Sequence, residues 1–223
     1  MSSIVSSRKA RAFHHASDIP DEVWRMLSEN EPFANHILPF AKKAKNFPRG
    51  ADKDQLWIAL YDDTNDVDFV LSCTKGPLGN LPIFIVPSKA SAARLAEEEE
   101  DDMDLTDSLL LLVSCLLDEV SLQRVFSVFS VARVTEKFAE IFEAEAHARQ
   151  QDDIQAHENA YYDATLTFCT RESFNESLDL TFPQRGSEDI TITLCRADMS
   201  HLPGIKTLCK AFHETLVGIS FLT

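Results

Sequence analysis

Residues 68–88, DFVLSCTKGPLGNLPIFIVPS, contain two apolar runs on either side of a loop with Gly-Pro and Gly-Asn pairs. Each run is short, alternates along the chain and is bounded by turn-forming residues, which predicts a strand. Apolar side chains fill both sets of alternating positions, so each strand would present an apolar surface on both faces. We therefore expect this stretch to form the centre of a sheet that is covered on both sides.

The segments around this centre predict a sheet that is mostly antiparallel. Residues 55–62, QLWIALYD, alternate in the same way, and the short polar loop 63–66 predicts an antiparallel hairpin with residues 68–74. Residues 83–86 then extend the meander. A further strand at residues 124–130, reached through a helix, implies a parallel crossover connection from residues 83–86.

Helices are predicted around the sheet by capping residues and by the spacing of apolar side chains. Asp18 is the expected N-cap of the first helix, whose first turn contains Pro20. The fold class predicted by the whole pattern is α/β, or α+β, with a mixed, mostly antiparallel central sheet and helices on both faces. The other expected elements are helices at residues 33–45, 106–120 and 132–150 and a strand at residues 164–170.

Composition and charge limit the partners and the compartment. The chain has 223 residues with 44% hydrophobic content, which is enough to bury a core. A formal net charge of −15 argues against nucleic acid or an anionic membrane surface as the main partner, because the negative field of the chain repels both. The five cysteines show no CxxC spacing and lie in apolar runs, which indicates buried free thiols. No apolar run is long enough for a signal peptide or a membrane span, so we expect a cytoplasmic or nuclear protein, not a secreted one.

Two segments are expected to lack regular structure. Residues 1–17 are polar and basic, and we expect a poorly ordered tail in which His14 and His15 do not bind metal. Residues 89–104 include seven carboxylates between residues 97 and 104. Because like charges repel one another, this segment is predicted to be a solvated, mobile acidic loop.

Three strings resemble a known family. They are FVLSCTKGPLGNLPIFIV, RVFSVFS and YYDATLTFCTRESF, and they are similar to segments of divergent fungal proteins of the GNAT superfamily of acyl-CoA N-acyltransferases. The expected order of elements also resembles the order in that family after its first strand. The resemblance implies a GNAT-like domain over residues 18–180, acetyl-CoA as cofactor and an amine as acceptor. In the family the pantetheine arm of the cofactor lies between two splayed strands, which implies a groove here at Phe84, Val86, Phe126 and Val128.

The chain departs from the family pattern at the parts that carry the chemistry. The family holds the cofactor's pyrophosphate on a glycine-bearing loop before a helix. Residues 97–105 read EEEEDDMDL, which contains no glycine and carries carboxylates that repel phosphate. The family often has a tyrosine as general acid on the helix that corresponds to residues 132–150, where this chain has none, and Tyr161 and Tyr162 follow only later. The catalytic residue is therefore unknown.

The C-terminal segment carries a second resemblance. Residues 190–212, ITITLCRADMSHLPGIKTLCKAF, are similar to the opening of a GNAT domain, with an alternating strand followed by the start of a helix. This implies that residues 189–223 are the first strand and first helix of a truncated second unit. Because the residues before Asp18 are too polar for a first strand, we expect residues 190–195 to pair with the main sheet in its place.

Other candidate chemistry rests on single residues or pairs. Cys209 and His213 lie four residues apart on one helix face and could bind metal or act as nucleophile and base, but two side chains do not make a site. Cys73 lies in the central strand and is interpreted as a small buried hydrophobic residue, not as a nucleophile. We expect no metal site.

Two functions from different classes follow from this sequence. The first is a degenerate or truncated relative of acetyl-CoA-dependent N-acetyltransferases, weakly active or inactive in this chain. The alternative is a noncatalytic interaction or regulatory domain whose groove binds a peptide or a partner domain. An open cleft between Phe84 and Phe126, with free N–H groups near Leu105, would favour the transferase, and a filled one would favour the interaction domain.

Overall fold

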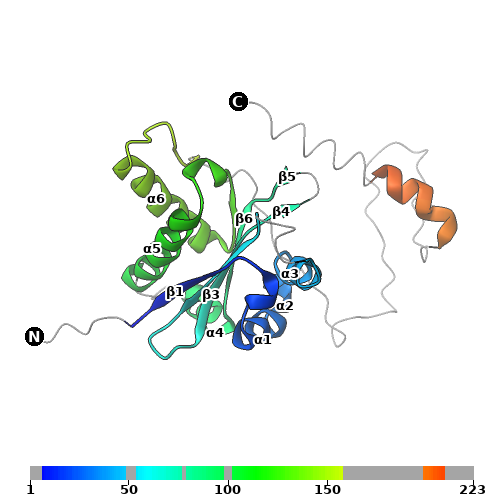
Figure 1. Ribbon diagram of the computed structural model, residues 1–223, viewed down its shortest axis with the longest axis horizontal. Coiled ribbons are helices and arrows are strands. Elements are labelled where there is room, and N and C mark those ends of the chain that lie inside the picture. Colours follow the sequence, from blue (N-terminus) through cyan, green and yellow to red (C-terminus); the bar gives the residue numbers. More distant parts are fainter. Residues whose placement is uncertain (1–6, 49–53, 77–78, 98–101, 158–197, 209–223) are drawn as a thin grey trace, which may run out of the picture. The chain divides into compact units, whose positions relative to one another are not determined.

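A computed structural model describes residues 7–48, 54–76, 79–97, 102–157 and 198–208 of the chain. The chain divides into two compact units, Met1–Phe168 and Cys169–Thr223, which are described separately. The first unit is a mixed α/β domain with a mostly antiparallel open sheet (Figure 1). None of the helices in the described part of the chain has the length and hydrophobicity that a bilayer crossing requires.

The sheet confirms the predicted meander and crossover. Its five strands lie in the order β1 (Lys9–Phe13), β2 (Leu56–Tyr61), β3 (Val67–Cys73), β6 (Ile83–Pro87) and β7 (Val128–Phe129). The pairs β1–β2, β2–β3 and β3–β6 are antiparallel, and the pair β6–β7 is parallel. The loop after β3 forms a small hairpin, β4 (Lys75–Gly76) with β5 (Gly79–Asn80), in which Gly79 has a φ of +126° that favours glycine.

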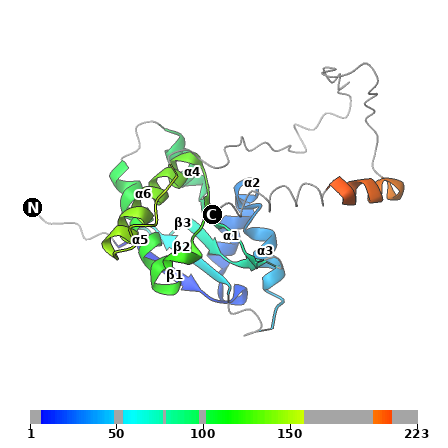
Figure 2. The same ribbon diagram turned by 90° about the horizontal axis from the view of Figure 1, so that it is seen from above.

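Helices cover both faces of this sheet, as the apolar character of both strand faces predicted (Figure 2). On one face lie α1 (Asp21–Glu29), α2 (Glu31–Ala34) and α3 (Leu38–Ala44), and their apolar residues pack with Trp57, Val70 and Val86 of the strands. On the other face lie α5 (Asp102–Glu119) and α6 (Ala132–Ala148), which pack with the alternate strand residues Ile58 and Leu71. Successive residues of a strand therefore point into different cores, one between the sheet and α1–α3 and the other between the sheet and α5–α6.

The prediction of a poorly ordered tail is wrong for residues 9–13, because they form the edge strand β1 against β2. Its burial alternates: Phe13 is 4% exposed in the α1–α3 core, while Ala10 and Ala12 pack against the α5–α6 core. Small side chains suit these two positions because α5 packs close to β1. The pattern therefore has little hydrophobic signal, and basic residues at the exposed positions of an edge strand hide it further.

The β1 strand also corrects the prediction for residues 190–195. We expected those residues to take the first-strand position, but β1 occupies the place next to β2. Residues 190–195 lie outside the described residues, as does the expected strand at residues 164–170. In the second unit, residues 202–208 are helical, and Asp198 caps the preceding 3₁₀ helix Met199–His201.

Proline sets the helix boundaries that the sequence placed incorrectly. Helix α1 begins after Pro20, which is its N-cap, whereas the expected cap Asp18 lies in the 3₁₀ helix Ala16–Asp18. The helix expected at residues 33–45 is divided into α2 and α3, and Pro39 lies in the first turn of α3. A proline is favoured there because its missing N–H has no partner in a first helical turn.

The acidic loop expected at residues 89–104 is largely helical. Residues 89–96 form α4 (Lys89–Ala96), and the Ser88 hydroxyl caps it by accepting from the Ser91 N–H at 3.1 Å. Buried Asp68 of β3 anchors the helix, because its carboxylate accepts from the Ser91 hydroxyl and pairs with Arg94 at 2.9 Å. Residues 98–101 lie outside the described residues.

The crossover strand is shorter than expected. Residues 128–129 alone form β7 within the predicted strand 124–130, and a 3₁₀ helix, Leu122–Arg124, precedes it. Arg124 explains this turn, because its guanidinium donates to the backbone carbonyls of Thr74 and Leu81. The side chain is thus committed to the β4–β5 region and not to the sheet.

Candidate functional site

The edge of β6 beyond β7 is the place where the resemblance implies a cofactor groove. Parallel pairing is limited to Ile83 with Val128 and Phe84 with Phe129, and the Ile83 N–H donates to the Ser127 carbonyl at 2.9 Å. Strand β6 continues for three residues after its last paired residue. Because backbone groups alternate in direction along a strand, those of Ile85 and Pro87 face the β7 side. We call these backbone groups the β6 edge.

Hydrogen bonds from within the domain already engage the β6 edge. The Ser130 hydroxyl donates to the Ile85 carbonyl at 2.8 Å. The side-chain amide of buried Asn30 donates to the Pro87 carbonyl at 2.5 Å. Proline has no N–H, so Pro87 offers no donor to a ligand. Both carbonyls of the β6 edge therefore have partners from distant parts of the sequence, and one of its two donors is missing.

The four predicted groove residues do not lie on one surface. Phe84 stacks on His36, with ring centroids 4.9 Å apart, and its ring also meets Phe129 at 5.6 Å. Val86 is buried in the α1–α3 core, whereas Val128 packs against the α5–α6 core on the opposite face. Phe126 is 60% exposed. Their role as cofactor-binding residues stays a prediction.

The start of α5 has the wrong charge for phosphate. Asp104 lies in its first turn, and the Arg8 side chain forms an ion pair with that carboxylate and donates to the Asp104 carbonyl at 3.3 Å. Free N–H groups near Leu105 would favour a transferase, and the Leu105 side chain is buried in the α5–α6 core. A helix N-terminus attracts anions, but here the first turn itself carries the Asp104 carboxylate, which repels a phosphate.

The sulfur nucleophile candidate Cys73 is buried, and burial raises the pKa of its thiol. Half-buried Cys115 on α5 has its pKa raised to about 11, first by burial and then by Glu119 and Asp118. A thiol reacts as its thiolate, so both are poor nucleophiles at neutral pH. Tyr161, Cys209 and the other candidates of the C-terminal segment, Tyr162 and His213, lie outside the described residues.

The raised pKa of Cys115 predicts slow alkylation. At pH 8 a thiol of pKa about 11 is ionised to about one part in a thousand, against about a quarter for an ordinary thiol. Iodoacetamide should therefore label Cys115 at least about tenfold more slowly in the folded chain than in urea, and faster as the pH rises toward 11. Peptide mass spectrometry measures the rate at this residue alone. Equal rates in buffer and in urea would contradict the assignment.

His14 and His15 take part in ordinary structural contacts. The His14 ring lies 3.2 Å from the Glu119 carboxylate, and the His15 ring contacts the Ser17 hydroxyl and the Phe47 carbonyl. Within the described ranges, no group of three histidine, cysteine or acidic side chains is placed to hold a metal ion.

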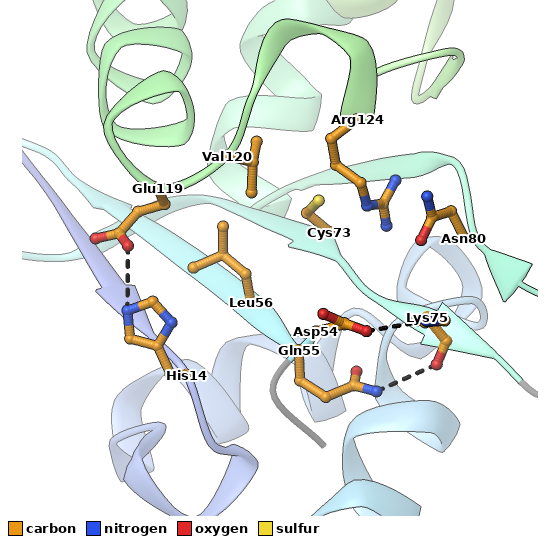
Figure 3. Close-up of a pocket in the computed structure, with 10 residues that line it drawn as sticks. All are labelled: His14, Asp54, Gln55, Leu56, Cys73, Lys75, Asn80, Glu119, Val120 and Arg124. Atoms are coloured by element: carbon orange, nitrogen blue, oxygen red, sulfur yellow. Dashed lines mark hydrogen bonds and ion pairs between the residues drawn. The ribbon is translucent and has the colours of Figure 1, made fainter. Parts of the chain in front are cut away.

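A pocket of about 350 Å³ lies at the other end of the sheet from the β6 edge (Figure 3). The sequence did not reveal it, because its walls come from segments far apart in the chain. The one local signal is Gln55, a polar residue that begins an otherwise apolar strand segment. The pocket is lined by His14, Asp54, Gln55, Leu56, Cys73, Lys75, Asn80, Glu119, Val120 and Arg124.

Comparisons with known proteins identify no relative. No protein-family model matches the chain, and neither a curated protein nor a solved structure matches it significantly. Function is therefore inferred from the geometry of the domain and from the chemistry of its residues.

Proposed function

We propose that this domain is a degenerate GNAT-like domain, related to acetyl-CoA-dependent N-acetyltransferases, that does not transfer acetyl groups. The order of elements supports the relation: β1, helices, the antiparallel strands β2, β3 and β6, a helical crossover, the parallel strand β7 and then α6. This is the order that the sequence resemblance implies. Strand β1 supplies the first strand that the sequence pattern did not predict.

The proposed loss of activity rests mainly on the hydrogen bonds that the β6 edge already makes within the domain. The pantetheine arm of acetyl-CoA contains two amides, and a buried amide without hydrogen-bond partners costs several kcal/mol, roughly 2–7 depending on the reference state. The carbonyls of Ile85 and Pro87 already accept from Ser130 and Asn30, and Pro87 removes a donor. A pantetheine arm at this edge would have to share these carbonyls with Ser130 and Asn30 or displace them, and it would find no N–H donor at Pro87.

Electrostatics add to the same conclusion. The helix that follows β6 directly is α4, whose Ser88 cap is engaged with Ser91, and the start of α5 carries Asp104 with its partner Arg8. The chain also has a net charge of −15, which repels the phosphates of acetyl-CoA. Neither helix start supports a pyrophosphate site of the family's type.

A second candidate, a noncatalytic interaction domain, is favoured by one side chain. Phe126 is 60% exposed just before β7, although phenylalanine is large and apolar. Exposed aromatic residues are enriched at protein interfaces. A peptide or partner domain that covers Phe126 would give this domain a role without catalysis.

An acetyl-transfer assay tests the proposal. Transfer from acetyl-CoA to an amine releases free CoA thiol, which a colorimetric thiol reagent measures against the chain's own cysteines in a blank without acetyl-CoA. With a lysine peptide, a polyamine and an amino sugar as acceptors, the release rate should equal the rate without protein. Turnover that depends on an amine and disappears on heat denaturation would contradict it.

A further inference from the structure

The pocket of about 350 Å³ is separate from the β6 edge. Its floor lies where β2 begins and β3 ends, at the paired residues Leu56 and Cys73, whereas the β6 edge lies toward the end of β6 that pairs with Phe69. The C-terminal end of α5, the β4–β5 hairpin and His14 after β1 form its walls (Figure 3). Its volume is at the lower end of those that hold small molecules.

Gln55 supplies an unused acceptor in this pocket. The residue is 3% exposed, and its Nε2 donates to the Lys75 carbonyl at 3.1 Å. That bond fixes which way the amide points, because only the nitrogen can donate. The Oε1 atom is buried, and no donor among the described residues reaches it. A buried acceptor without a partner is unfavourable, so this atom favours a ligand that presents an N–H or O–H group.

Arg124 supplies a fixed positive charge to the same pocket. Its Nη1 donates to the Leu81 carbonyl at 3.0 Å and its Nη2 to the Thr74 carbonyl at 2.6 Å. These bonds use two of the five guanidinium N–H donors and hold the side chain in place. Figure 3 shows the guanidinium directed into the pocket, near Asn80. Such a preorganised guanidinium is suited to a carboxylate.

The other charged or titratable side chains of the pocket lie in two pairs. Lys75 pairs with Asp54 at 3.0 Å, and His14 lies 3.2 Å from Glu119. Among the lysine, arginine and carboxylate residues of the lining, the two basic ones, Lys75 and Arg124, equal the two acidic ones, Asp54 and Glu119, in number. A ligand with a single net charge would leave part of this arrangement unmatched, whereas a ligand with one group of each charge matches it.

We propose that this pocket binds a free α-amino acid. Its ammonium group donates to Gln55 Oε1, and its carboxylate accepts from Arg124. Gln55 Oε1 calls for a donor group and Arg124 for an anionic group, and the volume limits the ligand to a small molecule. The site does not involve acetyl-CoA, so it stands independently of the degenerate-transferase proposal.

Titration of the full chain with the twenty L-amino acids, followed by two-dimensional NMR of the labelled protein, tests this proposal. At least one amino acid should bind and shift the signals of residues around the pocket. Its methyl ester, which lacks the carboxylate, and its N-acetyl derivative, which lacks the ammonium, should each bind at least tenfold more weakly. The absence of any binding amino acid, or an equal affinity for either derivative, would overturn it.

A variant separates binding from folding. Gln55→Met keeps the size of the side chain and removes the acceptor, so the affinity should fall at least tenfold. Gln123→Met, an exposed position outside the pocket lining, is the matched control and should leave the affinity unchanged. An unchanged affinity in Gln55→Met would overturn the proposal. If that variant does not fold, the comparison of the amino acid with its two derivatives on the natural chain still decides the outcome.

Discussion

Phe13→Asp is expected to lower the free energy of unfolding by about 3–5 kcal/mol, since it places a carboxylate without a partner in the α1–α3 core. Phe13 is 4% exposed at the end of β1, opposite Trp57 of β2. The loss combines the missing aromatic contacts with the cost of burying the charge or protonating it. Urea unfolding followed by fluorescence of Trp24 and Trp57 gives this free energy.

Arg11→Asp is the matched control for this prediction. Arg11 lies two residues earlier on the same face of β1, but it is exposed. The same new side chain should there cost no more than about 1 kcal/mol, the range for surface changes. If both variants lost the same stability, or neither lost any, residues 9–13 would not form a buried edge strand.

Leu109→Ala is expected to cost about 2–5 kcal/mol of unfolding free energy, the range for removing a buried leucine side chain. Leu109 is fully buried on the face of α5 that packs against the sheet. The substitution keeps the helix propensity high, so the loss reports packing and not helix formation.

The neighbouring residue gives a close control. Leu110 is 43% exposed on the other side of α5, and Leu110→Ala should change the unfolding free energy by less than about 1 kcal/mol. Both free energies come from the same urea titration. A reversed order of the two costs would mean that α5 presents a different face to the sheet.

The central sheet could be predicted because its signal is local. Strands β2, β3 and β6 carry apolar residues on both of their faces, and the structure buries the alternate residues in two separate cores. Such alternation requires no knowledge of distant residues. The parallel crossover to β7 followed from the helix between the two strands in the same way.

Strand β1 could not be predicted because its burial depends on a distant helix. Ala10 and Ala12 contribute little hydrophobic signal, and they are suited to their positions only because α5, about a hundred residues later, packs closely there. Helix α4 was missed for a related reason. The acidic residues that follow it dominated the pattern, whereas buried Asp68 of β3 and its partners anchor the helix.

The candidate sites depend even more on distant residues. The state of the β6 edge results from Asn30 and Ser130, which approach β6 from α1 and from the end of β7. The buried Oε1 acceptor of Gln55 is identified by the absence of a donor that reaches it among the described residues of the folded domain. Neither property is a feature of a short sequence pattern, so the sequence alone could supply the residue types but not their partners.

The account of the β6 edge is tested most directly by calorimetric titration of the purified chain with acetyl-CoA, at low and at high salt. The two salt concentrations separate the repulsion by the net charge, which salt screens, from the lack of hydrogen-bond partners, which it does not. We predict heats equal to those of dilution at both concentrations, because Ser130 and Asn30 engage the carbonyls of the edge. A micromolar dissociation constant at either salt concentration would contradict this account.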